Sequence, residues 1–95
     1  MAIKSFKDVT TEGVFQGKRP KGFPTEIVNV TRRKLRMVDA AHELRDLNVP
    51  PNNKLHPLKA DREGQHAISV NDQYRVCFRW HDGDAYDVEF TDYHD

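Results

Sequence analysis

The fold of this chain is decided by one stretch of alternating side chains, Tyr74-Arg75-Val76-Cys77-Phe78-Arg79-Trp80. After the turn residues His81-Asp82-Gly83, the alternation resumes in Asp84-Ala85-Tyr86-Asp87-Val88-Glu89-Phe90. Apolar residues at every second position indicate strands with one buried face. The stretch therefore predicts a β-hairpin.

The apolar faces of the two strands set the register that we expect for this hairpin. Directly opposed residues point to the same face of a sheet, so the apolar side chains of the two strands have to meet. A two-residue loop would set Phe78 opposite Asp87. A three-residue loop, with Gly83 in its left-handed position, sets Phe78 opposite Tyr86. We therefore expect the three-residue loop.

The segments in front of the hairpin predict two helices and further strands. From Thr25, a suitable N-cap, apolar residues gather on one arc of a helical wheel and arginines on the other. The expected elements are a strand at 3–6, a short helix through Val14 and Phe15 that begins at Asp8 or Thr10 and ends at Gly17, the main helix at 25–42, a further helical turn at 41–47, an edge strand at 55–58 and a strand at 67–70.

This order of elements favours an α+β fold, with the helices on one face of an antiparallel sheet. We expect residues 1–95 to form a single domain. The opposite face of the sheet, which carries Arg75 and Arg79, is left open. A functional site is expected there.

Composition indicates a small core and a highly charged surface, because only 37% of the residues are apolar and 32% are charged. No apolar run is long enough to span a membrane, and residues 1–6 lack the apolar block of a signal peptide. The single cysteine, Cys77, excludes an internal disulfide and fits a reducing compartment. We expect a soluble cytoplasmic protein.

The net charge of zero hides an asymmetry along the chain. Residues 1–64 hold 13 Lys and Arg against 8 Asp and Glu, whereas residues 65–95 hold 2 against 7. The basic half is able to meet phosphates, or the two halves neutralise each other on folding. Basic loops and solvated helix faces are alternatives to RNA or ribosome binding for the cations concerned, which are Lys18, Arg19, Lys21, Arg32, Arg33 and Arg36.

Five side chains carry the chemistry of metal-free RNA cleavage. In that reaction the 2′-hydroxyl attacks the neighbouring phosphate, which requires a base, cations for the phosphorane and an acid for the leaving oxygen. Taken singly, each group has a structural or surface alternative, which for Arg75 is a cross-strand pair with Glu89. The candidates are His56, Lys59, Arg75, Tyr93 and His94.

A metal site is not expected in this chain. The histidines His56, His66, His81 and His94 have no short ligand spacing, and only one cysteine accompanies them. Cys77 lies between Val76 and Phe78, which is typical of an inert buried thiol. Neither a glycine-rich phosphate loop nor a serine-based constellation is present.

Several segments together resemble the HigB family of the RelE/ParE toxin superfamily. The resemblance implies a RelE-like fold: an N-terminal strand, two helices and an antiparallel strand meander packed against them. It also implies a ribosome-dependent endoribonuclease that cuts mRNA in the A site, with a HigA-type helix-turn-helix antitoxin as partner and no metal or other cofactor. The segments that carry it are Ile3-Lys4-Ser5-Phe6, Leu55-His56-Pro57-Leu58-Lys59-Ala60-Asp61-Arg62-Glu63-Gly64, Tyr74-Arg75-Val76-Cys77-Phe78, Asp82-Gly83-Asp84-Ala85-Tyr86 and Asp92-Tyr93-His94.

The resemblance also implies a role for each site residue. His56 and His94 are the acid–base candidates, and it leaves open which is the acid. Lys59 and Arg75 stabilise phosphate charge. Tyr93 orients or stacks on a base, and Asp92 supports the site.

The chain departs from the family pattern in three respects: Ala60 stands where the family often has glycine, Gln65-His66 replaces an aromatic pair, and the net charge is neutral. Asp95 follows His94 and brings the carboxylate of the chain end near the expected site. A ParE-like protein that binds a topoisomerase on the same fold is the main alternative, and it needs no catalytic set. A degenerate toxin retained only as a partner for its antitoxin is a third hypothesis.

Overall fold

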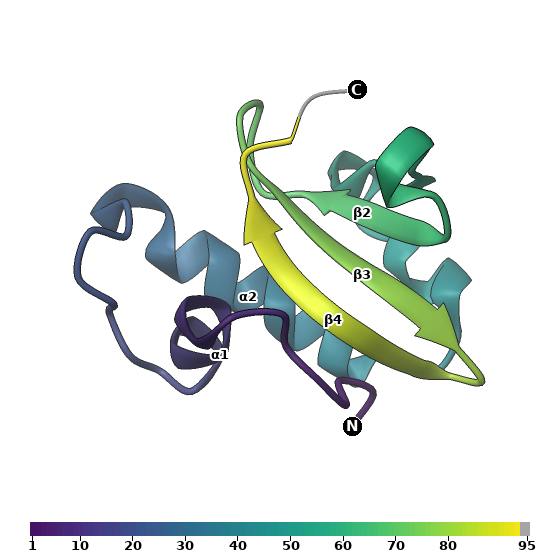
Figure 1. Ribbon diagram of the computed structural model, residues 1–95, viewed down its shortest axis with the longest axis horizontal. Coiled ribbons are helices and arrows are strands. Elements are labelled where there is room, and N and C mark those ends of the chain that lie inside the picture. Colours follow the sequence, from purple (N-terminus) through teal and green to yellow (C-terminus); the bar gives the residue numbers. More distant parts are fainter. Residues whose placement is uncertain (94–95) are drawn as a thin grey trace.

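The structure, a computed structural model, describes residues 1–93. Within that range four strands form one antiparallel sheet in the order β1-β2-β3-β4. The helix α2 crosses behind the sheet, and α1 packs against α2 and β4 (Figure 1). The α+β fold expected from the sequence is confirmed. Its elements are α1 (Val9–Phe15), α2 (Val28–Ala40), β1 (His56–Pro57), β2 (Gln65–Ser69), β3 (Arg75–His81) and β4 (Asp84–Thr91).

A local sequence signal accounts for how α1 begins. The carboxylate of Asp8 accepts a hydrogen bond of 2.7 Å from the backbone N–H of Thr11, which makes Asp8 the N-cap of α1. The segment expected as one helix at 25–42 instead begins with a 3-10 turn, η1 (Thr25–Ile27), before α2. The N-cap expected at Thr25 for the main helix is wrong, because Thr25 lies inside this 3-10 turn and α2 follows Ile27 without a side-chain cap.

Two further 3-10 helices connect α2 to the sheet, and a third lies between β1 and β2. The helical turn expected at 41–47 is displaced by a few residues and is a 3-10 helix, in which the carboxylate of Asp46 accepts hydrogen bonds of 3.0 Å from the backbone N–H groups of His42 and Glu43. The three helices are η2 (Leu44–Asn48), η3 (Pro51–Asn53) and η4 (Ala60–Arg62).

The N-terminal segment expected as a strand is reduced to two isolated parallel bridges along β4. Ile3 pairs with Ala85 and Phe6 pairs with Val88. The same segment is tied to α2, because the backbone N–H of Ala2 donates to the carbonyl of Asp39 at 2.7 Å. It therefore bridges the edge of the sheet and the helix layer (Figure 1).

The three-residue hairpin loop expected from the sequence is wrong. His81 pairs with Asp84, so the turn has two residues, Asp82 and Gly83, with φ of 49° and 81°. Positive φ at both positions matches the right-handed twist of the flanking strands. Near the turn, Arg79 then faces Tyr86.

A β-bulge explains how a two-residue turn keeps the apolar faces together. The register shifts by one residue between Cys77 and Arg79, and Asp87 in β4 has φ of 54°. Beyond the shift Val76 faces Phe90, so both halves of the hairpin bury apolar side chains. The expected pairing of Arg75 with Glu89 is also wrong, because the extra residue sets Glu89 opposite Cys77 and Arg75 opposite Thr91.

The main core lies between the sheet and the two helices. Leu35, Val38, Phe78 and Val88 are fully buried in it. A second, smaller cluster lies on the other face, where Leu58, Ala67 and Cys77 are buried and Tyr93 packs on them. No helix within residues 1–93 is long and apolar enough to cross a membrane.

Candidate active site

Lys59 and Tyr93 line one pocket on the sheet face that the helices leave uncovered. Its volume is about 220 Å³, and Pro57 and Leu58 complete the lining. Leu58 is buried and anchored to β2, because its backbone N–H donates to the carbonyl of Gln65 at 2.9 Å. The fold thereby brings the amine of Lys59 and the phenol of Tyr93 together beside the apolar side chains of Pro57 and Leu58.

The turn after Lys59 directs the chain back over the sheet. Ala60 has φ of 57°, in the left-handed region that favours glycine, and begins η4. This geometry gives a physical reason for glycine at this position in the family pattern. Lys59 itself is exposed, so its ammonium is accessible to a ligand in the pocket.

Arg62 is a functional candidate that the sequence analysis missed. Its guanidinium Nη1 donates to Oε1 of Glu89 at 3.1 Å and to Oε1 of Gln65 at 3.2 Å, and its Cζ lies 5.4 Å from the ring centroid of Tyr93. Burial disfavours the charge, but the hydrogen bond and the charge of Glu89 outweigh burial and raise the pKa of Arg62. The sequence analysis does not connect Arg62 with Glu89, because the expected register places Glu89 opposite Arg75.

His56 lies on β1 and lines a second groove rather than the Lys59 pocket. Its Nδ1 is 2.8 Å from the carbonyl of Lys54. A carbonyl only accepts, so this contact places the proton on Nδ1. Pro57 borders both spaces. The groove has a volume of about 400 Å³, and its lining residues are Leu44, Arg45, Asn48, Leu55, His56, Pro57 and His66.

His66 is the second imidazole of this groove, next to His56. It pairs with Pro57 on one side and Phe78 on the other. Desolvation, together with the nearby His56, lowers the pKa of His66 below 6.5. Its Nδ1 is buried and has no hydrogen-bond partner within residues 1–93.

Arg75 begins β3 and Asp92 follows the last residue of β4, so both lie at the same end of these two paired strands. Arg75 is on the same face as Cys77, two residues along β3, and its Nη1 donates to the carbonyls of Asn71 and Tyr74. The carboxylate of Asp92 is exposed and accepts a hydrogen bond of 3.2 Å from Gln73 Nε2. His94 lies outside the described residues.

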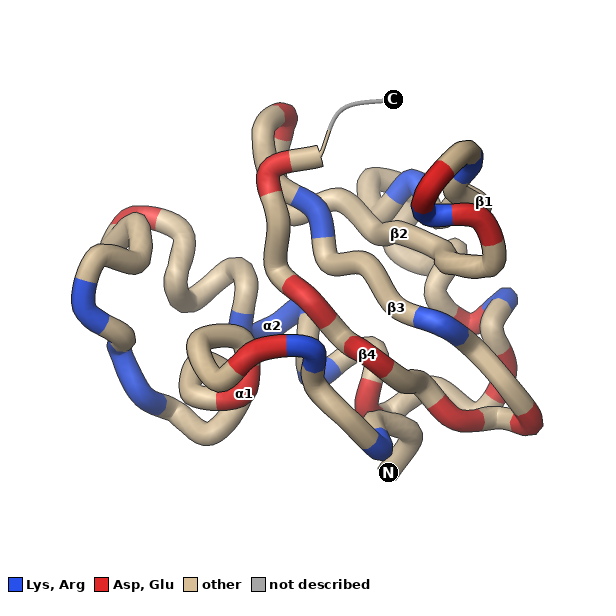
Figure 2. The backbone as a smooth tube through the Cα atoms, viewed as in Figure 1, with Lys and Arg blue, Asp and Glu red and all other residues tan. Residues whose placement is uncertain are grey.

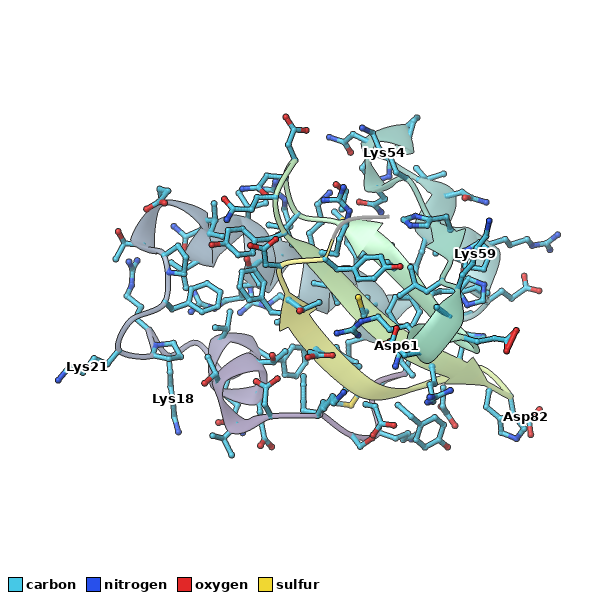
Figure 3. All side chains as sticks on the ribbon, turned by 45° about the horizontal axis from the view of Figure 1, so that its top comes forward. Lys18, Lys21, Lys54, Lys59, Asp61 and Asp82 are labelled. Carbon is cyan, nitrogen blue, oxygen red and sulfur yellow. The ribbon has the colours of Figure 1, made fainter. Side chains whose placement is uncertain are left out.

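The cations expected to bind RNA lie elsewhere. Figure 3 shows Lys18 and Lys21 at one end of the molecule and Lys54 and Lys59 at the other. Arg19 is exposed in the same loop as Lys18 and Lys21. The loop between α1 and α2 is basic, whereas β4 is acidic (Figure 2).

On α2, the three expected arginines differ in their surroundings. Arg33 and Arg36 are exposed. Arg32 donates from Nε to the carbonyl of Val14 and from Nη2 to the carbonyl of Lys18, both at 2.7 Å. The guanidinium of Arg32 therefore ties the α1–α2 loop to α2, and a structural role accounts for it.

Across residues 1–93, no three His, Cys, Asp or Glu side chains are grouped so that they could hold a metal ion. Among the described candidates, Lys59 and Tyr93 share one pocket, and Arg62 lies over the ring of Tyr93. His56 and His66 line the neighbouring groove.

Comparison with known proteins gives concordant matches over nearly the whole chain. A family model described as RelE-like toxin of type II toxin-antitoxin system HigB matches residues 4–94. A Proteus vulgaris protein named Endoribonuclease HigB is 39% identical over 92 residues, which cover 97% of this chain and 99% of that protein. A Vibrio cholerae protein named Toxin HigB-1 is 41% identical over 86 residues, which cover 90% of each.

A solved structure supports the fold alone. A crystal structure of a YafQ mutant from E. coli superimposes with a TM-score of 0.64 at 13% sequence identity. The match covers 95% of this chain and 90% of that one.

Proposed function

The chain belongs to the HigB family of RelE-like toxins of type II toxin–antitoxin systems, and from this premise we propose that it is an endoribonuclease that cuts mRNA in the ribosomal A site. Cutting there arrests translation in the cytoplasm. A HigA-type helix-turn-helix antitoxin is the proposed partner that keeps the toxin inactive. The relative from Proteus vulgaris, which is named Endoribonuclease HigB, supports the reaction type.

The observation that carries this proposal is the shared pocket of Lys59 and Tyr93. A phosphate entering the pocket meets the ammonium of Lys59, which stabilises negative charge, and the phenol of Tyr93. The hydroxyl group of Tyr93 is a hydrogen-bond donor and acceptor that can orient the RNA at the pocket. A protein that acted only by binding a topoisomerase would not need this arrangement.

We propose that the remaining steps fall to the residues whose roles the resemblance to the HigB family implies. One of His56 and His94 removes the proton of the 2′-hydroxyl, whose oxygen attacks the adjacent phosphorus. The bond from phosphorus to the 5′-oxygen breaks, and the other histidine protonates that oxygen. The products are a 2′,3′-cyclic phosphate and a 5′-hydroxyl. Lys59 and Arg75 stabilise the phosphorane, and Asp92 supports the site.

The exposed cations at the other end of the molecule have a different proposed role. Lys18 and Lys21 are exposed at the end of the molecule opposite Lys59 (Figure 3), and Arg36 is exposed on α2, so these cations suit contacts to rRNA phosphates. These contacts would orient the toxin on the ribosome without taking part in the reaction. Arg33 and Arg19 belong to the same set.

The test is primer extension on one defined mRNA in three forms. The purified protein is added to naked mRNA, to the mRNA on programmed ribosomes, and to the ribosome-bound mRNA with a single 2′-deoxynucleotide at the cut site. We expect cuts at the A-site codon only on ribosomes, and none with the 2′-deoxynucleotide, because the nucleophile is missing.

Two results would overturn the proposal. Equal cutting of naked mRNA would remove the ribosome from the mechanism. Absence of cutting in all three forms, with growth arrest on expression, would favour a topoisomerase-binding toxin of the ParE type.

A further inference from the structure

Arg62 joins four separate segments of the chain at the edge of the pocket. It belongs to η4 and donates hydrogen bonds to Gln65 of β2 and to Glu89 of β4. Its guanidinium also lies over the ring of Tyr93, in the segment after β4. Tyr93 follows β4, which ends at Thr91, so it lies outside the paired strands. Its ring is held by side-chain contacts with the Leu58, Ala67 and Cys77 cluster and with Arg62.

The charge of Arg62 is already matched inside the protein. Its ion pair with Glu89 is 3.1 Å long, and the two side chains are only 19% and 17% exposed. Lys7 adds a second, weaker contact to Glu89 at 3.8 Å from the exposed side. A guanidinium in these surroundings is poorly placed to bind a phosphate, in contrast to the exposed ammonium of Lys59.

The ring of Tyr93 is held from two directions. Leu58, Ala67 and Cys77 form the apolar cluster on which it packs. The guanidinium of Arg62 lies over the ring at 5.4 Å, a distance at which a cation is attracted to the π-face. Without the guanidinium, the ring keeps its apolar support but loses the contact that fixes its orientation.

We propose that Arg62 is a positioning residue that, anchored by Glu89 and Gln65, holds the Tyr93 ring at the Lys59 pocket. This inference rests on the proposed function for its catalytic consequence. The position of the ring itself is measurable without any reaction. Arg62 acts through Tyr93 and does not touch the RNA.

Three variants and one control test this proposal. Arg62→Ala removes the guanidinium, Arg62→Lys keeps a cation but not the planar fork, and Glu89→Gln removes the charge that anchors it. The control is Arg79→Ala. Arg79 lies on the face of β3 that carries Cys77, and its ion pair with Asp87, at 3.8 Å, joins two side chains that are about half exposed. Thermal unfolding of each variant establishes that it is folded.

Two readouts are measured on the folded variants. The first is the NMR signals of the Tyr93 ring, assigned with Tyr93→Phe. The second is single-turnover cleavage of mRNA on programmed ribosomes at increasing toxin concentration. Arg62→Ala is expected to shift the Tyr93 signals and to lower the saturating rate by roughly 10- to 100-fold, because small displacements of a catalytic group cost about this much.

The half-saturating toxin concentration should stay within about twofold, since Arg62 does not contact RNA. Arg62→Lys should restore part of the rate, and Glu89→Gln should shift the same ring signals by less than Arg62→Ala does. Arg79→Ala should leave both readouts unchanged. If Arg62→Ala does not fold, Arg62→Lys and Glu89→Gln decide the test.

The proposal is overturned if the Tyr93 ring signals are the same in wild type and in the folded Arg62 and Glu89 variants. It is also overturned if Arg62→Ala changes only the half-saturating concentration, because Arg62 would then be a ligand of the RNA. Failure of the wild type to cut would count against the proposed function instead, and the ring signals would still decide the role of Arg62.

Discussion

The ammonium of Lys34 donates a hydrogen bond of 2.6 Å to Oδ1 of Asn53 in the interior of the protein. Lys34 is 4% exposed and Asn53 is fully buried. The amide of Asn53 also donates to the carbonyl of Leu47 at 3.1 Å. These bonds attach η2 and η3 to α2, so they fix the segment that leads into β1 and the Lys59 pocket.

Replacing Asn53 should destabilise the protein strongly. Asn53→Ala leaves the buried ammonium of Lys34 without its acceptor, and loss of such a partner costs about 3 kcal/mol. Asn52→Ala is the matched control, because Asn52 is exposed in the same 3-10 helix and should change the free energy of unfolding by less than about 0.5 kcal/mol. Urea denaturation measures both. Equal effects of the two substitutions would contradict the role of Asn53.

The stability of the protein should fall as the pH drops below about 6.5, in part because of His66. Its pKa in the folded state lies below the ordinary value of 6.5, so over the intervening pH range the unfolded chain binds a proton that the folded protein excludes. Protonation therefore favours unfolding. His66→Gln should reduce this dependence. The measurement is the free energy of unfolding from about pH 7.5 down to about pH 5, a range that includes the ordinary pKa of histidine.

His81→Gln is the control for that experiment, because His81 is 75% exposed at the end of β3. Its pH dependence should match that of the wild type. An unchanged pH dependence in His66→Gln would show that the folded protein accommodates the protonated ring.

Arg32 should contribute to stability rather than only to RNA binding. Arg32→Ala removes the hydrogen bonds to the carbonyls of Val14 and Lys18, each of which is worth about 1.5–3 kcal/mol when the donor is charged. Because water partly replaces these bonds, we expect the free energy of unfolding, measured by urea denaturation, to fall by about 2 kcal/mol. Arg36→Ala, on the exposed face of the same helix, should have little effect. A loss no larger than that of Arg36→Ala would exclude the structural role.

The β-bulge predicts an unusual tolerance at Asp87. Because φ is 54° there, Asp87→Gly should leave stability unchanged or raise it, whereas Asp87→Val should lower it by about 1–2 kcal/mol. The ion pair of Asp87 with Arg79 is exposed, so its loss is common to both variants and contributes little. Thermal unfolding distinguishes them. If the valine variant is the more stable one, the bulge is misplaced.

The sequence predicted the strands of the hairpin but not their register. Alternation in residues 74–90 shows which faces are buried, and that requirement is met equally by a longer loop or by a bulge. The difference depends on one backbone conformation at Asp87, for which apolar periodicity gives no signal. Asp82-Gly83 is a strong local signal for a two-residue turn. Without a bulge, however, such a turn would not match the apolar faces of the two strands, so the sequence favours the longer loop.

Part of the candidate site was also predictable from the sequence. Lys59 and Tyr93 were identified by residue type and by resemblance, and the structure places them in one pocket. Their roles stay predictions. Arg62 was missed because its partner Glu89 reaches it only in the observed register. Arg32 was assigned to the RNA face because the helical wheel does not show that the preceding loop supplies acceptors.

The most direct test of the account compares Lys59→Gln with Lys54→Gln in cleavage of mRNA on programmed ribosomes. Both substitutions remove one exposed positive charge from the same end of the molecule (Figure 3). Only Lys59 lines the pocket with Tyr93. We predict that Lys59→Gln lowers the saturating rate by about 100-fold or more, as expected for loss of a group that stabilises transition-state charge, and that Lys54→Gln changes it by less than about threefold. Equal rates for the two variants would show that the pocket is not the site of cleavage.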